Sequence, residues 1–148
     1  MFTRKNSMLA VFTLILVFAA QGVASAPALP NPVLYFLGAE YFETGGKKLI
    51  RYTFDVLNKD VYPDELFAAS PSLPPCGSNT KAARTWIDLF DQSGKRLNGF
   101  CALGKSSDLN KIWFALEIDV IPPSWIYIEM NDRKTNTKYK SNLADTTL

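Results

Sequence analysis

Apolar and polar residues alternate along most of this 148-residue chain, which is the pattern of β-strands that bury one face. The clearest run is 49–57 (LIRYTFDVL), where large apolar side chains take every second position. Helix signals are weak after residue 26. We therefore expect strands at 33–43, 49–57, 83–90, 96–103, 111–120, 125–131 and 137–143, and leave open a short strand or helical turn at 65–69.

Turn-forming residues separate the expected strands and indicate how they pair. Gly45 and Gly46 can adopt positive φ between the first two strands, which predicts a tight hairpin, and Gly94 has a similar place in the turn 91–95. The fold predicted is an all-β, antiparallel two-sheet sandwich of seven or eight strands, because one sheet alone would leave its apolar face in water. The expected core comprises Ile50, Tyr52, Phe54, Ile87, Leu89, Ile112, Phe114, Leu116, Ile126 and Ile128, with Ile118 continuing the apolar face of 111–120.

The order of these segments resembles that of the immunoglobulin-like and fibronectin type III sandwich superfamily. The resemblance covers about residues 33–143 and is one of pattern and spacing. It departs from immunoglobulin domains in having Cys76 in a proline-rich loop, and it brings no catalytic residue with it. Small exported bacterial sandwich modules of unassigned role are similar in the stretches 75–79, 84–86 and 99–101. The segments that carry the superfamily resemblance are Arg84-Thr85-Trp86-Ile87-Asp88, Asp91–Lys95, Ile112–Ile118, Pro123–Tyr127, Trp125–Asn131 and Lys138–Asn142.

The N-terminal segment has the parts of a secretory signal peptide. A positive start at 4–5 precedes an uncharged run at 8–20 (MLAVFTLILVFAA), and small residues suited to cleavage follow. We expect cleavage between Ala24 and Ala28, and a secreted or periplasmic mature protein with no membrane insertion. The alternative is an uncleaved N-terminal anchor.

The chain is accordingly predicted to have four parts. Residues 1–26 are the signal peptide, and 27–32 (PALPNP) form an extended proline-rich leader. Residues 33–143 form the sandwich domain. The last five residues, 144–148, are expected to fray.

Charge and composition exclude several classes of function. Without Arg4 and Lys5 of the signal peptide, 14 basic residues face 14 acidic ones, so no electrostatic footprint for nucleic acid or anionic lipid is present. The absence of histidine excludes Ser-His-Asp and Cys-His catalysis and nearly every catalytic zinc site.

Cys76 and Cys101 are the only cysteines, and export places them in an oxidising compartment. We expect them to form a disulfide; two buried thiols or a metal pair are the alternatives. The bridge would secure the irregular connection 58–79, which contains four prolines. Leu66 and Phe67 in this connection are expected to pack under the sheet and close one end of the sandwich.

Two kinds of carboxylate site can be nominated. The pairs Asp88 with Asp91 and Glu117 with Asp119 could act as acid and base in glycoside hydrolysis. Asp60, Asp64 and Glu65 could offer oxygen ligands to calcium, although their spacing matches no known loop. Both sets are also typical of solvated strands and turns, so no metal or other cofactor is predicted.

Aromatic residues are the strongest compositional feature, at 13% of the chain. Trp86, Trp113, Trp125 and Tyr127 are candidate binding residues, because each tryptophan alternates with its strand's aliphatic series and outward aromatic rings bind sugars or partner proteins. The alternative is that these rings are themselves covered. The function expected is a non-catalytic exported module that binds an unknown protein or glycan, and the alternative is a small carbohydrate-active enzyme that uses a carboxylate pair.

Overall fold

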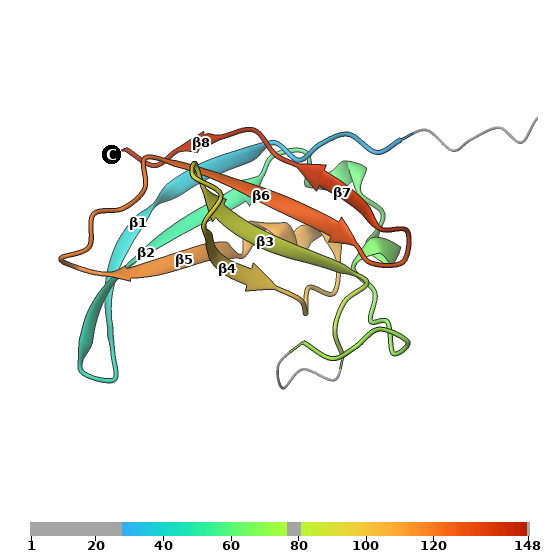
Figure 1. Ribbon diagram of the computed structural model, residues 1–148, viewed down its shortest axis with the longest axis horizontal. Coiled ribbons are helices and arrows are strands. Elements are labelled where there is room, and N and C mark those ends of the chain that lie inside the picture. Colours follow the sequence, from blue (N-terminus) through green and yellow to red (C-terminus); the bar gives the residue numbers. More distant parts are fainter. Residues whose placement is uncertain (1–27, 77–80, 148) are drawn as a thin grey trace, which may run out of the picture.

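The computed structural model describes residues 28–76 and 81–147 and consists of two antiparallel sheets that overlie one another (Figure 1). One sheet has the order β1-β2-β5, and the other has the order β4-β3-β6-β7, with β8 also paired to β6. The prediction of an all-β sandwich of seven or eight strands is confirmed. The strands are β1 (Leu34–Thr44), β2 (Lys47–Val56), β3 (Thr85–Asp91), β4 (Arg96–Phe100), β5 (Ile112–Glu117), β6 (Trp125–Asp132), β7 (Thr137–Lys140) and β8 (Ala144–Asp145).

The β1–β2 hairpin is built as its sequence predicts. Gly45 and Gly46 have φ values of 56° and 74°. Two-residue hairpin turns require such positive values, which residues with a Cβ atom disfavour. Gly38 has a φ of 143° at a bulge where β1 shifts register against β2. The hairpin tip extends beyond the rest of the sandwich at the lower left of Figure 1.

The core lies between the sheets and follows the alternation of the sequence. Eight of the ten expected residues are buried, while Ile50 and Leu116 are half-buried and pack against the cluster. Tyr52 and Phe114 face each other across β2 and β5 as a stacked pair, with centroids 4.8 Å apart. Burial of such side chains supplies most of the stabilisation of a sandwich.

Three short 3-10 turns close one end of this core: η1 (Lys59–Val61), η2 (Asp64–Leu66) and η3 (Ser106–Asn110). Leu66 and Phe67 are buried in the core cluster, as expected, and Leu109 of η3 is fully buried beside them. The carboxylate of Asp64 holds the two loops together by accepting hydrogen bonds from the Ser106 amide and hydroxyl, both at 2.8 Å. The open question at 65–69 thus resolves as a helical turn.

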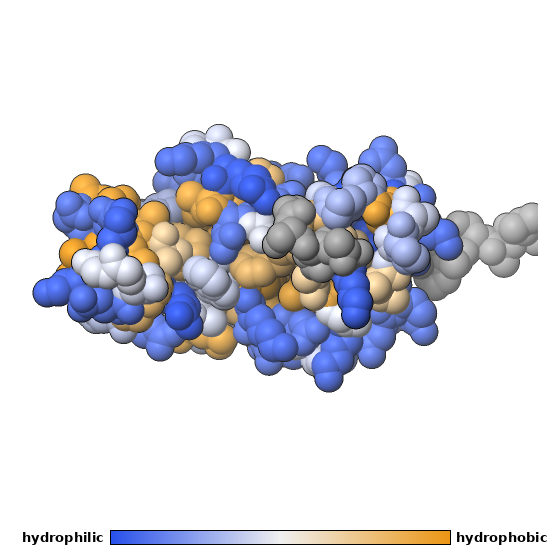
Figure 2. Space-filling view, turned by 90° about the horizontal axis from the view of Figure 1, so that it is seen from below, coloured by the Kyte–Doolittle hydropathy of each residue, from blue (hydrophilic) through white to orange (hydrophobic). Residues whose placement is uncertain are grey.

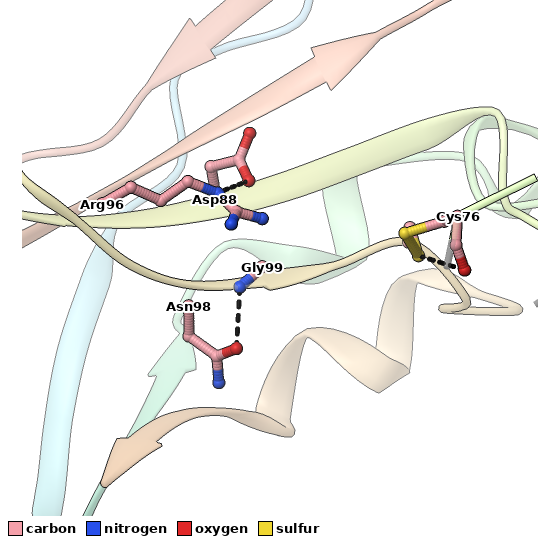
Figure 3. Close-up of a disulfide and its surroundings, with 6 residues drawn as sticks. Cys76, Asp88, Arg96, Asn98 and Gly99 are labelled. Carbon is pink, nitrogen blue, oxygen red and sulfur yellow. Dashed lines mark hydrogen bonds and ion pairs between the residues drawn. A yellow bond between two sulfur atoms is a disulfide. The ribbon is translucent and has the colours of Figure 1, made fainter. Parts of the chain in front are cut away.

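The disulfide between Cys76 and Cys101 is present, with Cα atoms 6.1 Å apart (Figure 3). It joins the end of the proline-rich connection to the residue that follows β4. In the same strand Gly99 lets Arg96 fold back over the sheet, since a Cβ there would lie 1.9 Å from Arg96 Nη2.

Four expectations at strand ends are wrong. β4 ends at Phe100, β5 at Glu117 and β7 at Lys140, so the predicted strands 96–103, 111–120 and 137–143 are too long. Ile118 therefore lies in a turn, half exposed, rather than on the apolar face of a strand. Nor does the tail fray up to residue 147, because β8 pairs with the start of β6 and the Thr146 amide donates to the Ser124 carbonyl at 2.9 Å.

The described part of the leader has no regular secondary structure and is docked on the domain. The Tyr62 hydroxyl donates to the Pro30 carbonyl at 2.7 Å, and burial raises the pKa of Tyr62 to about 12. Asn58 contacts the leader through its side-chain amide, which donates to the Asn31 carbonyl. The signal-peptide prediction concerns residues outside the described range. Among the described residues, no helix has the length and apolar character needed to cross a bilayer.

Candidate binding surface

The four nominated aromatic residues lie in three different places. Trp113 is on the outer face of the sheet β1-β2-β5, paired with Thr53 of β2. Trp86 and Tyr127 are on the outer face of the other sheet, and Trp125 is at the start of β6 beside β8. The structure therefore does not gather them into one site.

The rings on the outer face of the second sheet are already occupied by neighbours. The Arg133 guanidinium lies over the Trp86 ring, 3.6 Å from its centroid. Tyr127 stacks on Phe90 at 5.2 Å and has the Lys140 ammonium 4.0 Å from its ring. With 9% of its surface exposed, Tyr127 is not an accessible binding residue, and its nomination is wrong.

The charges on this face are also paired with one another. Asp88 accepts from Arg96 Nε at 2.6 Å (Figure 3), and elsewhere on this face Glu129 lies 3.6 Å from Lys138. The aromatic rings and charged side chains on the outer face of the second sheet therefore contact one another and cover that face.

The outer face of the first sheet is organised around Arg51. Its guanidinium carbon lies 4.7 Å from the Phe42 ring centroid and 5.4 Å from that of Trp113, so the cation contacts two aromatic rings. Glu40, its cross-strand partner, lies 3.2 Å away as an ion pair. Arg51 Nε is buried and has no hydrogen-bond partner among the described residues.

Trp113 is held in place but remains accessible. Its backbone carbonyl accepts a hydrogen bond from the Asn98 side chain at 2.7 Å, and Phe100 meets its ring edge-on at 6.5 Å. The side chain is still 38% exposed. Tyr35 and Leu37 on β1 are more than half exposed, and a depression of about 230 Å³ lies between Leu37 and Thr53.

We call this surface the aromatic face, defined by Tyr35, Leu37, Phe42, Arg51 and Trp113. Sequence reasoning found only Trp113 of these five. The alternation placed Arg51 opposite the core, but its position between two rings depends on strand pairings that a single strand does not reveal. The Arg51 side chain is 38% exposed, and a partly exposed guanidinium beside exposed rings can bind both hydrogen-bond acceptors and apolar surface.

Trp125 belongs to a separate groove at the side of the sandwich. The groove has a volume of about 440 Å³ and lies between the start of β1 and β8. Trp125, Tyr35 and Leu143 line it and are each between 42% and 53% exposed. Tyr35 thus belongs to both the aromatic face and this groove.

The nominated carboxylate pairs are engaged in structural contacts. Asp91 caps its own turn by accepting from the Ser93 hydroxyl and the Ser93 and Lys95 amides, and these bonds lower its pKa. Asp88 pairs with Arg96, and Glu117 lies 2.5 Å from Lys47 Nζ. β5 ends at Glu117, so Asp119 lies in the turn that follows and is not on the same strand.

The nominated calcium ligands do not converge. Asp64 is used by Ser106, whose amide and hydroxyl lower the pKa of its carboxyl group, while Asp60 lies in η1. Within 28–76 and 81–147, no three His, Cys, Asp or Glu side chains are grouped so that they could hold a metal ion.

Comparison of the chain with family models, curated proteins and solved structures gave no match.

Proposed function

We propose that this chain is an exported, non-catalytic sandwich module that binds a protein or a glycan through the aromatic face. The observation that carries the proposal is Arg51, placed between Phe42 and Trp113 with 38% of its side chain exposed, on a surface where Tyr35 and Leu37 are also exposed. Exposed rings beside a hydrogen-bond donor suit both sugar rings and protein side chains.

The pairing of the strands supports the resemblance to the immunoglobulin-like superfamily. In those domains the first, second and fifth strand positions share one sheet, and the third, sixth and seventh share the other. The order β1-β2-β5 and β4-β3-β6-β7 has the same division, with β4 as an additional edge strand. Members of this superfamily commonly serve as recognition modules, so the likeness favours binding by analogy.

Export is supported by two independent features. The first 26 residues carry the composition of a signal peptide, and the only two cysteines form a disulfide. The enzymatic alternative has less support, since Asp88, Asp91 and Glu117 are bound in ion pairs or a turn.

The proposal can be tested with two matched arginine variants. Immobilised glycans and the proteins of the producing cell's envelope are screened with the mature chain and with Trp113→Ala, Arg51→Gln and Arg133→Gln. We expect Trp113→Ala and Arg51→Gln to weaken any binding tenfold or more, and Arg133→Gln, on the covered face, to leave it unchanged. Equal binding by all variants, or turnover of a polysaccharide that a carboxylate variant abolishes, would contradict the proposal.

A further inference from the structure

One long edge of the first sheet is unpaired. β1 pairs with β2 on one side only, and in an antiparallel ladder alternate residues direct their N–H and C=O groups away from the partner strand. The two-residue hairpin turn makes Thr44 and Lys47 a hydrogen-bonded pair, which fixes that alternation along the strand. The backbone groups of Ala39, Tyr41 and Glu43 therefore point outward, and beyond the bulge so do those of Phe36 and Leu34.

At its first residue this edge already has a partner that imitates a strand. The Asn142 side chain accepts from the Leu34 amide at 2.8 Å and donates to the Leu34 carbonyl at 3.0 Å. From Phe36 to Glu43, the outward backbone groups have no such partner within the part of the chain that the structure describes. We call this stretch the β1 edge.

The other edges of the sandwich carry features that discourage pairing. The Asn98 side chain bonds to the backbone of β5 at Trp113. β7 is four residues long and bears Lys138 and Lys140, and β4 has five residues. Short strands and edge lysines are the usual protections against unwanted strand addition. By contrast β1 has 11 residues and no lysine or arginine.

The surroundings of the β1 edge indicate what it would accept. Tyr41 is 76% exposed, and beyond Phe36 the edge leads into the groove lined by Tyr35 and Trp125. The charges on β1 are acidic and lie on opposite faces: Glu40, which pairs with Arg51 but stays 63% exposed, is on the outer face, and Glu43 is on the other. Asp145 lines the groove. A strand that paired here would place its side chains beside apolar rings and carboxylates.

We propose that the β1 edge binds an extended segment of a partner protein, which adds to the sheet β1-β2-β5 as a fourth strand. The segment alternates apolar residues with lysine or arginine: the cations would lie on the face of Glu40, which is 63% exposed, and the apolar side chains on the face of Phe36 and Tyr41. A second copy of this chain paired through its own β1 would bring two acidic strands together, which disfavours that occupant. The inference rests on the proposed binding function and names its partner and its place.

Backbone amide exchange tests this proposal directly. The isotope-labelled mature protein is studied by NMR with the peptide VKVTVKVTVK, and with VEVTVEVTVE as the charge-reversed control. The amides of Ala39, Tyr41 and Glu43 should exchange rapidly in the free protein. Saturating lysine peptide should slow their exchange at least tenfold, and the glutamate peptide should have no effect.

Two variants of one residue separate backbone pairing from side-chain contact. Tyr41→Ala and Tyr41→Pro both remove the ring, but only proline also removes the outward N–H. An edge strand tolerates proline at such a position, because the N–H there does not bond to the neighbouring strand. We expect Tyr41→Pro to weaken peptide binding at least fivefold more than Tyr41→Ala, with the β2 amides of both variants as protected as in the parent.

Each other outcome overturns the inference. Edge amides that stay unprotected at saturating peptide, or equal binding of both peptides, would show that the β1 edge does not accept a basic strand. Protection that grows with protein concentration alone would identify a second copy as the occupant. A ligand that needs Trp113 while the edge amides remain unchanged would refute this inference and leave the proposed function standing.

Discussion

The two ends of the sandwich are finished in opposite ways. At one end, three 3-10 turns and the disulfide cover the core, and Leu66, Phe67, Leu103 and Leu109 are buried there. At the other end, the β1–β2 hairpin tip and the connection 118–124 leave large apolar side chains in solvent. Figure 2 shows hydrophobic surface at this end, on the left, and also along the middle of the same face. The large exposed side chains at this end are Tyr41, Ile118, Val120 and Ile121.

The difference separates residues that stabilise the fold from residues that are free for recognition. At the closed end, long irregular connections cover the core. The strands of a sandwich cannot cover the core at their own ends. The open end has no such cover, and the unpaired β1 edge extends to it. Exposed apolar patches of this kind often mark interaction sites.

Truncation of Phe67 at the closed end should have the largest effect. Its ring is fully buried in the core cluster, so Phe67→Ala should lower the free energy of unfolding by about 3–5 kcal/mol. Tyr41→Ala, the matched truncation at the open end, should change it by less than about 0.5 kcal/mol. Chemical denaturation followed by tryptophan fluorescence measures both values, and similar losses for the two variants would remove the distinction between the ends.

The closed end also shows how far the sequence predicts the fold. Alternation and turn residues predict the strands, because each depends on local geometry. The pairing of Cys76 with Cys101 follows from their being the only two cysteines. The role of η3 was not predicted, because Leu109 reaches the core only after the chain between β4 and β5 has turned back over it.

On the outer faces, the sequence predicts orientation but not neighbours. Trp86 and Trp113 both alternate with core residues, and the alternation cannot distinguish them. Arg133 covers Trp86 from beyond the end of β6, whereas Arg51 approaches Trp113 from the adjacent strand and leaves it partly exposed. Which ring is free depends on long-range register, and this is why Tyr127 was wrongly nominated.

Removal of the disulfide should be the next largest change. The bridge closes a loop of roughly 26 residues, so Cys76→Ala with Cys101→Ala should cost about 3–4 kcal/mol on the chain-entropy estimate. Limited proteolysis with mass spectrometry should then reveal a new cleavage site between Asn58 and Lys81. A double variant as stable and as protease-resistant as the parent would show that packing alone secures the closed end.

Acid should weaken the closed half of the second sheet through Asp132. Burial opposes ionisation of this carboxyl group, but hydrogen bonds from Arg84, Thr135 and the Lys134 amide outweigh it and lower the pKa to about 2. Because the unfolded chain has the ordinary, higher pKa, the stabilisation is complete above about pH 4 and is lost as the pH falls toward 2.

The loss attributable to Asp132 should be about 2 kcal/mol. Thermal unfolding between pH 5 and 2 measures it, and Asp132→Asn should be less stable at pH 5 and should flatten this dependence. Asp145→Asn, in the exposed β8, is the control and should retain it. An unchanged slope in Asp132→Asn would assign the acid sensitivity to other carboxylates.

The smallest effect should come from the open end itself. Ile121 is 90% exposed and Ile118 is 50% exposed, so much of their apolar surface is already in contact with water in the folded protein. Replacing them by serine therefore removes little buried apolar area, and Ile118→Ser with Ile121→Ser should change the free energy of unfolding by at most about 1 kcal/mol in total. The same denaturation curves measure this change. A loss above about 2 kcal/mol would mean that these side chains belong to the core. Both ends of the core would then be covered by side chains, and the comparison between a closed and an open end would not hold.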